Sequence, residues 1–155
     1  MNEQHSPEAT GPLPTDLLLL SILLMVALHE LVPIVTLVAG PLRLAGAVPI
    51  IAGLALNIWV GRLFKRAGTA VKPVDPSVAL VLTGPFRISR NPMYLGMALA
   101  LAGIAIGLGT ASPWVIVPAF VWQIRVRFIV LEESRLEACF GQQFLGYKAS
   151  VRRWL

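Results

Sequence analysis

Cysteine and histidine are scarce in this chain of 155 residues, and that scarcity narrows its chemistry. The single cysteine, Cys139, excludes an intramolecular disulfide. A lone thiol among aliphatic neighbours is typical of a small buried hydrophobic residue rather than a nucleophile. The two histidines lie far apart, and no group of residues has the spacing of metal ligands. We therefore expect no metal.

Motifs of soluble nucleotide-binding and hydrolytic folds are absent as well. The sequence has no P-loop, no G-x-G-x-x-G after a strand and no serine-centred elbow. The formal net charge of +5 does not indicate nucleic acid, because the cations lie beside apolar runs, where anionic lipid head groups attract them. Membrane lipids are the expected partners, and nucleic acid is not.

Charge is also low, at 14% of the residues, whereas 56% are hydrophobic. This balance lies outside the range of soluble globular proteins and predicts an integral membrane protein. Four apolar stretches are each near the length of about 20 residues that a membrane helix needs, at 17–39, 44–64, 93–109 and 114–131. The predicted fold is all-α, with about four transmembrane helices in two hairpins and C-terminal amphipathic helices at the cytoplasmic interface.

Five parts follow along the chain. They are a disordered tail at 1–16, a first transmembrane hairpin at 17–64, a basic loop at 65–92, a second hairpin at 93–131 and C-terminal helices at 132–155. The tail is acidic before the first apolar run, so a cleaved secretory signal is not expected. Gly40-Pro41 and the segment 110–113 predict very short turns within the hairpins.

The distribution of cations predicts the orientation. Basic residues cluster in the central loop and after the fourth span, at Arg62, Lys65, Arg66, Lys72, Arg87, Arg90, Arg135, Lys148, Arg152 and Arg153, against a single Asp75 in the loop. The opposite turns carry only Arg43. The positive-inside rule therefore places both basic segments in the cytoplasm, as in a bacterial-type inner membrane.

Small residues in the third span predict close helix packing. Gly103 and Gly107 form a small-xxx-small pair that lets two helix backbones approach. We favour packing against a neighbouring span over a dimer interface.

The segment from Gly84 to Tyr94 is the first candidate site. Pro85 and Pro92 restrain its backbone, so the arginines between them have defined positions. We expect Arg87 to face lipid and Arg90 to hold a ligand carboxylate in a bidentate manner. Tyr94 is either an interfacial anchor or an aromatic face for a ligand such as a sulfonium.

Glu132 and Glu133 form an adjacent carboxylate pair at the exit of the fourth span. Such a pair is costly near hydrocarbon unless it is matched by cations or donors. One of them is expected to pair with Arg90, Arg125 or Arg127 while the other faces a ligand; the alternative is an ordinary ion-paired helix start. Gly141 should end this helix, and a second short amphipathic helix should follow, carrying Phe144, Tyr147, Val151 and Trp154 at helical spacing.

His29 and Glu30 are expected near the middle of the first span. Ionisable residues are expensive there, so both should face the bundle interior, with Asn57 as one candidate partner. A structural hydrogen bond and a place in the substrate pocket are equally favoured. Pro33, one turn later, is expected to kink the helix.

Taken together, the motifs resemble the isoprenylcysteine carboxyl methyltransferase and phospholipid methyltransferase superfamily. The residues that carry the resemblance span about 60–155: Gly68-Thr69, the run from Leu82 to Tyr94, Glu132-Glu133, Phe140-Gly141, Tyr147 and Arg152-Arg153-Trp154. This chain departs from the superfamily pattern at two positions. The better-known eukaryotic members usually have histidine where this chain has Asn91, and members commonly have tyrosine where it has Phe144.

This resemblance implies a membrane enzyme that transfers the methyl group of S-adenosylmethionine to a lipophilic acceptor, such as an isoprenylcysteine-like carboxylate, a lipid amine or a thiol. The implied cofactor contacts are Arg90, Asn91, Pro92, Tyr94, Glu132, Glu133 and Tyr147, with the C-terminal helices covering the cofactor. Arg90 and Glu133 are the implied catalytic residues. Arg152 is implied to close the pocket or to meet the substrate. His29 and Glu30 lie outside the residues that carry the resemblance, and they are candidate substrate contacts from their place in the first span.

Two other functions compete with this one. Sterol reductases share a related Arg-His-Pro-x-Tyr hairpin, so an NADPH-dependent membrane reductase is the first; Asn91 and the small size of the chain argue against it. The second is a non-catalytic membrane scaffold, which would bind no small ligand.

Overall fold

The computed structural model describes residues 12–68 and 80–155. Its α-helices are α1 (Pro14–Leu31), α2 (Ala47–Arg66), α3 (Pro92–Leu108), α4 (Ile116–Ile124), α5 (Val130–Phe140) and α6 (Gln142–Ser150). Within these two ranges no β-strand forms; one isolated bridge joins Thr36 and Thr110. The expected all-α fold is confirmed.

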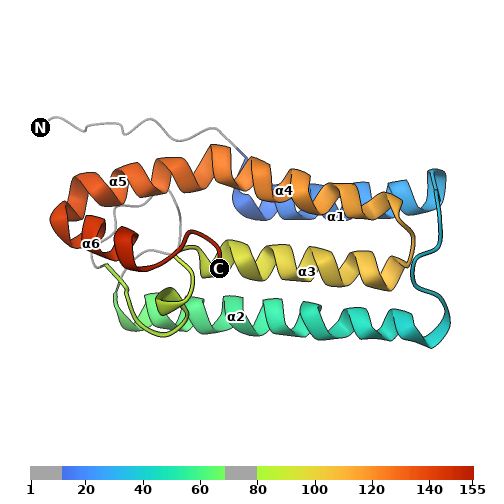
Figure 1. Cartoon of the computed structure of the whole chain (residues 1–155), viewed down its shortest axis with the longest axis horizontal. Helices are drawn as coiled ribbons and strands as arrows, with labels where there is room; N and C mark the ends of the chain where they lie inside the picture. Colours follow the sequence, from blue (N-terminus) through green and yellow to red (C-terminus); the bar gives the residue numbers. More distant parts are fainter. Residues whose placement is uncertain (1–11, 69–79) are drawn as a thin grey trace, which may run out of the picture.

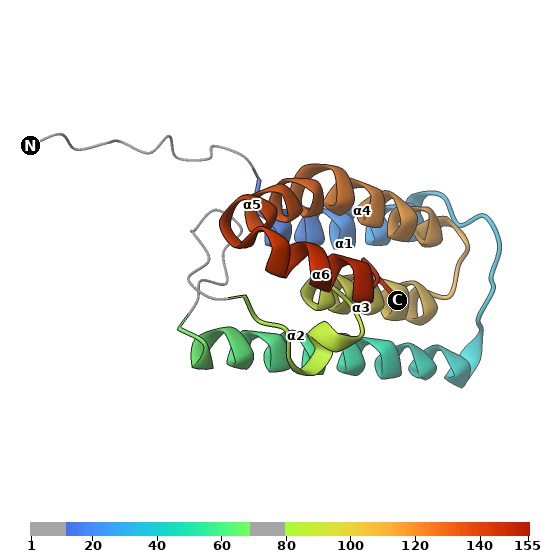
Figure 2. The same cartoon turned by 60° about the vertical axis from the view of Figure 1, so that its left-hand side comes forward.

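Three helical segments are long and apolar enough to cross a membrane: Pro14–Leu31, Gly40–Arg66 and Ser112–Phe140. The last joins α4 to α5 through the π-helical turn Arg125–Ile129. α3 is apolar but shorter, at 17 residues, and it lies in the middle of the bundle, between α2 on one side and α1 and α4 on the other (Figures 1 and 2). The protein therefore has the four apolar helical segments of a membrane bundle.

Helix pairing is different from two separate hairpins. α2 packs chiefly on α3, whereas α1 packs on α3 and α4. The first helix is also shorter than the expected 17–39, because α1 ends at Leu31. Pro33 disfavours helical geometry at Val32, so the chain leaves the helix there instead of kinking.

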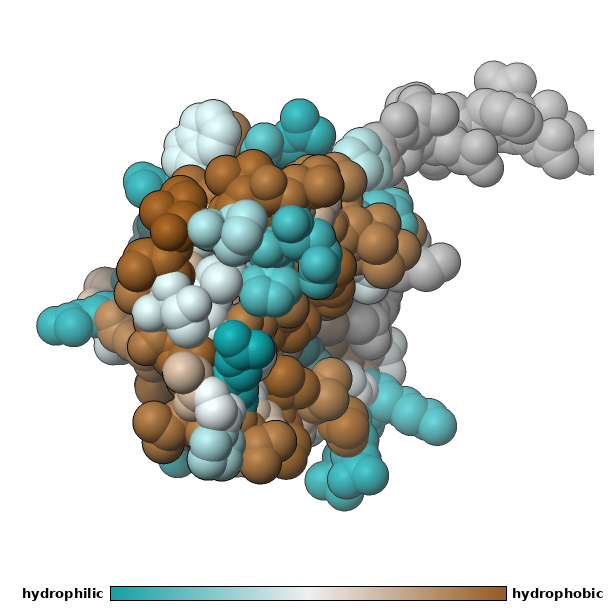
Figure 3. Space-filling model, turned by 90° about the vertical axis from the view of Figure 1, so that its right-hand side faces the viewer, coloured by the Kyte–Doolittle hydropathy of each residue, from teal (hydrophilic) through white to brown (hydrophobic). Residues whose placement is uncertain are grey.

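After α1, the chain runs extended along the turn between α3 and α4. The amides of Leu37 and Val38 donate to the Gly109 carbonyl at 2.8 and 3.0 Å, and the Ala111 amide donates to the Val35 carbonyl at 2.9 Å. A 3-10 helix, Gly40–Gly46, then leads directly into α2. The connection is therefore longer than the tight turn expected at Gly40-Pro41. Figure 3 views this end, where a few hydrophilic residues lie within a mostly hydrophobic surface.

Glycines bring the α2 and α3 backbones into direct contact. A Cβ built on Gly53 would collide with the Gly96 carbonyl oxygen, and one built on Gly46 would collide with the carbonyl oxygen of Gly103 and come 2.8 Å from the amide nitrogen of Gly107. The predicted close approach is confirmed at Gly103 and is made within one chain, whereas a Cβ on Gly107 would meet no atom within 4 Å. Gly53 and Gly96 extend the same contact toward the other end of α2.

Adding one methyl group at this contact should weaken the fold. We expect Gly53→Ala to cost about 1–3 kcal/mol, because the new Cβ meets backbone atoms that cannot rotate away. Gly61→Ala is the matched control on the same helix, since a Cβ there has no atom within 4 Å. Thermal melting in detergent should show a lower Tm for Gly53→Ala alone; an equal change in both variants would contradict the packing described here.

Of the other predictions from the sequence, the one for Gly141 is confirmed, and those for Cys139 and for the end of the last helix are wrong. Gly141 ends α5 as expected, with a positive φ of 49°. Cys139 is exposed rather than buried, and α6 ends at Ser150, before Trp154. Residues 1–11 of the predicted tail lie outside the described residues, as do Thr69, Lys72 and Asp75 of the loop.

Candidate functional site

The run from Gly84 to Tyr94 lies at the end of the bundle where α5 and α6 fold back over the start of α3 (Figure 1). A short 3-10 helix, Gly84–Arg87, begins it, and Pro92 is the first residue of α3. Phe86 is buried in a cluster with Val60, Phe144 and Tyr147. These apolar contacts fix the segment against α2 and α6.

Tyr147 ties α6 to this segment. Its hydroxyl donates to the Phe86 carbonyl at 2.7 Å. Burial raises the pKa of Tyr147 to about 12, and the nearby Arg90 cation acts in the opposite direction. Tyr147 is therefore a protonated donor at neutral pH, and it forms part of the wall beside Arg90.

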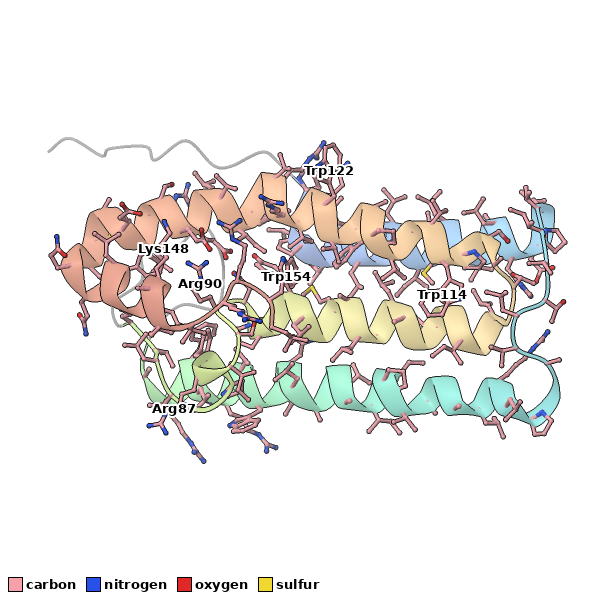
Figure 4. The ribbon with its side chains drawn as sticks, in the orientation of Figure 1. Arg87, Arg90, Trp114, Trp122, Lys148 and Trp154 are labelled. Carbon is pink, nitrogen blue, oxygen red and sulfur yellow. The ribbon has the colours of Figure 1, made fainter. Side chains whose placement is uncertain are left out.

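Arg87 and Arg90 point in different directions. Arg87 is exposed and points away from the bundle, whereas Arg90 points into the space between α5, α6 and the start of α3 (Figure 4). The Arg90 side chain is only 11% exposed. Its Nε and Nη1 are buried without a hydrogen-bond partner in the part of the chain that the structure describes. Unsatisfied buried donors on a charged group are costly, which is typical of a site that a ligand completes.

Glu133 lies between two arginines. Arg153 donates to it in a bidentate manner, from Nε to Oε1 at 3.0 Å and from Nη2 to Oε2 at 2.6 Å. Arg90 Nη1 is 3.4 Å from Oε1, which is an ion-pair distance without a hydrogen bond. The hydrogen bonds that Arg153 donates to Glu133 raise the pKa of Arg153, and burial lowers it by less.

The sequence named three candidate partners for the carboxylate pair, and the structure selects one of them. Glu133 pairs with Arg90, whereas Arg125 and Arg127 are exposed on the π-helical turn. Arg153, which makes the shorter contacts, was not predicted to pair with either glutamate. Both oxygens of Glu133 therefore face arginines.

Glu132 has a different neighbour. It accepts a hydrogen bond of 2.5 Å from the Tyr94 hydroxyl, and the Tyr94 ring packs on Phe128 with centroids 6.4 Å apart. The π-helical turn Arg125–Ile129 comes just before α5. Each i→i+5 bond encloses one residue more than an α-helical bond, so the turn shifts the rotation of α5 as a whole about the helix axis. Adjacent helix residues point about 100° apart, so the two glutamates face separate partners.

A short C-terminal strap, residues 151–155, closes one side of the site. The Arg90 amide donates to the Arg152 carbonyl at 3.0 Å, and Asn91 Nδ2 donates to the Arg153 carbonyl at 3.0 Å. Ser89 Oγ lies 3.3 Å from the same carbonyl. The side-chain amide of Asn91 therefore holds the strap in place.

Of the two adjacent arginines in the strap, the one that enters the site is Arg153. The Arg152 side chain is exposed, although the sequence pointed to it as the substrate contact. Val151 has extended geometry, and side chains alternate sides along an extended chain. That alternation would have separated the two arginines, but only if the helix had been known to end at Ser150.

His29 and Glu30 lie at the opposite end of the bundle from Arg90. They occupy the last turn of α1, not the middle of a span, and Glu30 is exposed rather than directed inward. His29 Nδ1 is 2.8 Å from Thr110 Oγ1, and Ser112 Oγ donates to the Leu28 carbonyl beside it. These contacts join α1 to the turn before α4. The structure thus does not bring either residue to the candidate site, and Asn57 does not partner them.

Metal binding was not expected from the sequence. Residues 12–68 and 80–155 contain no group of three or more His, Cys, Asp or Glu side chains able to hold a metal ion. The ionisable side chains that the structure gathers at the site are Arg90, Arg153, Glu132, Glu133, Tyr94 and Tyr147.

Comparison with known proteins gives two matches. A family model for phospholipid methyltransferases matches residues 42–143. A Haemophilus influenzae protein described as an uncharacterized protein is 40% identical over 63 residues, which make up 41% of this chain and all of that protein. No solved structure matches the chain. The family match covers about two thirds of the sequence, including α2, α3 and both glutamates, and the chain therefore belongs to the phospholipid methyltransferase family.

Proposed function

We propose that this protein transfers the methyl group of S-adenosylmethionine to a lipophilic acceptor at the cytoplasmic face of a membrane. Family membership supports methyl transfer to membrane lipid-like substrates. The observation that carries the cofactor assignment is Arg90, whose Nε and Nη1 are buried and lack a partner in the described residues. A ligand carboxylate accepts charge-assisted hydrogen bonds from such donors. Nε shares one edge of the guanidinium with Nη2, so a carboxylate fits that edge, and Nη1 is left for a second ligand oxygen.

The remaining groups also fit the amino-acid part of such a cofactor. Glu132 uses one oxygen for the Tyr94 hydroxyl and supplies negative charge for an ammonium or ribose hydroxyl. The Tyr94 ring is buried in the core beside Phe128, so Tyr94 contributes by holding Glu132 in place through its hydroxyl. Asn91 and Pro92 contribute by fixing the backbone of Arg90 and the start of α3, and Glu133 and Tyr147 contribute by surrounding the Arg90 side chain.

When bound, S-adenosylmethionine supplies a methyl group on a positively charged sulfur, which leaves as a neutral thioether once the lone pair of the acceptor has taken the methyl group. The protein then has to orient the two reactants and exclude water. Arg90 and Glu132 orient by charge, while the buried cluster around Phe86 keeps the α6 side of the site dry. A lipid amine, an isoprenylcysteine-like carboxylate and a thiol are the proposed acceptor classes, and the family description supports a phospholipid-like acceptor.

The proposed orientation rests on exposed cations. Arg62, Lys65, Arg66 and Arg87 are exposed at the same end of the bundle as Arg90. The opposite end has Arg43, whose Nε donates to the Val38 carbonyl. The positive-inside rule then places the site in the cytoplasm, and a bacterial-type inner membrane is the proposed location.

Transfer of a labelled methyl group tests the proposal. The protein in nanodiscs of mixed phospholipids is incubated with methyl-labelled S-adenosylmethionine, and label is measured in the organic extract. We expect extractable label that depends on the protein and is lost in Arg90→Gln. A reductase would instead consume NADPH, and a scaffold would do neither; either result would reject methyl transfer.

A further inference from the structure

The two arginines around Glu133 compete for one carboxylate. Arg153 makes two hydrogen bonds of 2.6 and 3.0 Å to it, whereas Arg90 only approaches Oε1 to 3.4 Å. The Glu133 side chain is 10% exposed and that of Arg153 is 28% exposed. Each Glu133 oxygen retains a second lone pair, and Arg90 approaches the one on Oε1 without forming a hydrogen bond. In this structure Arg153 has the stronger hold on Glu133.

If Arg90 rather than Arg153 made the bidentate pair with Glu133, the donors of Arg90 would no longer be available to a ligand. A bidentate pair with Glu133 would use the same kind of donors that a ligand carboxylate needs, and a ligand would then have to break that pair. Arg153 prevents a bidentate Arg90–Glu133 pair because it already makes the bidentate contact with Glu133. Glu133 offsets the charge of one arginine, so the three side chains together carry one surplus positive charge, and Arg90 is the more buried of the two arginines.

We infer that Arg153 is a positioning residue, which keeps Arg90 available for an anionic ligand by engaging Glu133. The inference rests on the proposed function in that S-adenosylmethionine, through its carboxylate, is the ligand. It assigns the strap a definite purpose. Asn91 Nδ2 and Ser89 Oγ both contact the carbonyl of Arg153 itself, so the segment that presents Arg90 also fixes the residue that competes for Glu133.

Calorimetric titration with S-adenosylmethionine in nanodiscs tests this inference without using activity. We expect Arg153→Gln to raise Kd about tenfold, because Glu133 then pairs with Arg90. Arg152→Gln is the matched control: it removes the same charge from the adjacent, exposed side chain and should leave Kd unchanged. Arg153→Lys keeps the charge without the bidentate fork and should give an intermediate Kd.

The decisive variant is Arg153→Gln combined with Glu133→Gln. With the carboxylate removed, nothing sequesters Arg90, so the double variant should bind S-adenosylmethionine more tightly than Arg153→Gln alone. A residue that only braces the strap would predict a double variant as weak as Arg153→Gln or weaker, and that result would overturn the inference. The Tm of each variant without ligand reports separately on folding.

The titration also separates this inference from the proposed function. Wild-type binding without rescue in the double variant rejects the role of Arg153 alone. If the folded wild-type protein does not bind, both are rejected.

Discussion

Replacing Arg90 by glutamine is expected to weaken S-adenosylmethionine binding by about a hundredfold or more. Two buried donors, Nε and Nη1, lie on different edges of the guanidinium and are available to two ligand oxygens, one of them from the carboxylate. A hydrogen bond to a charged group contributes about 1.5–3 kcal/mol, so the loss of two of them exceeds the roughly 2.8 kcal/mol that a hundredfold change requires. Glutamine is shorter and uncharged, and it cannot donate on both edges. Calorimetry on the protein in nanodiscs measures the effect.

Two further variants make this result specific. Arg90→Lys keeps the charge but loses the fork, so it should recover only part of the affinity. Arg66→Gln removes an exposed cation at the end of α2 and should bind like the wild type, because an exposed charge near the site acts weakly through water. Equal losses in Arg90→Gln and Arg66→Gln would mean that general surface charge, not a built site, attracts the ligand.

The second large effect is expected at Glu132. Glu132→Gln should raise the Kd for S-adenosylmethionine by about tenfold to thirtyfold, because the negative charge that faces the ligand ammonium or ribose is lost. The amide oxygen of glutamine still accepts the hydrogen bond from the Tyr94 hydroxyl, so the local structure should persist. The affinity change would therefore report on charge and not on folding.

Glu137 provides the control on the same helix. Its side chain is 44% exposed and pairs with Lys148 at 3.3 Å. Exposed pairs contribute little, so Glu137→Gln should change neither Kd nor Tm by much. An unchanged Kd in Glu132→Gln would remove Glu132 from the site and leave Arg90 as its sole charged contact.

Much of the membrane architecture was predictable because it depends on composition along the chain. The length of an apolar run limits what can cross a bilayer, and glycine spacing limits how closely two helices can pack. Gly141 was a readable stop signal, since a residue with φ of 49° favours glycine. These features depend on residues close together in the sequence, so they could be predicted without knowledge of the fold.

The end of α1 was predicted wrongly because the residues after it are apolar enough to continue a membrane helix. Val32–Ala39 is as apolar as a helix, but Pro33 acts on Val32, and the backbone groups that leave the helix find partners at Gly109 and Ala111. Hydropathy measures transfer into lipid and does not report where those backbone partners lie. His29 and Glu30 were placed in mid-span as a consequence.

Pairing within the site was predictable only in part. Arg90 was one of the three partners named for the carboxylate pair, but which glutamate faces it depends on the rotation of α5, which the π-helical turn Arg125–Ile129 shifts. Arg153 was missed because α6 was expected to continue through it. Both errors concern helix phase, which shifts by about 100° for each residue gained or lost.

Titration of the wild-type protein with S-adenosylmethionine in nanodiscs, measured by calorimetry beside a parallel titration with NADPH, tests the central claim most directly. The site around Arg90 predicts saturable binding of S-adenosylmethionine at one site per chain and no heat of binding with NADPH. A protein that melts cooperatively yet binds NADPH instead, or binds neither compound, would contradict the account.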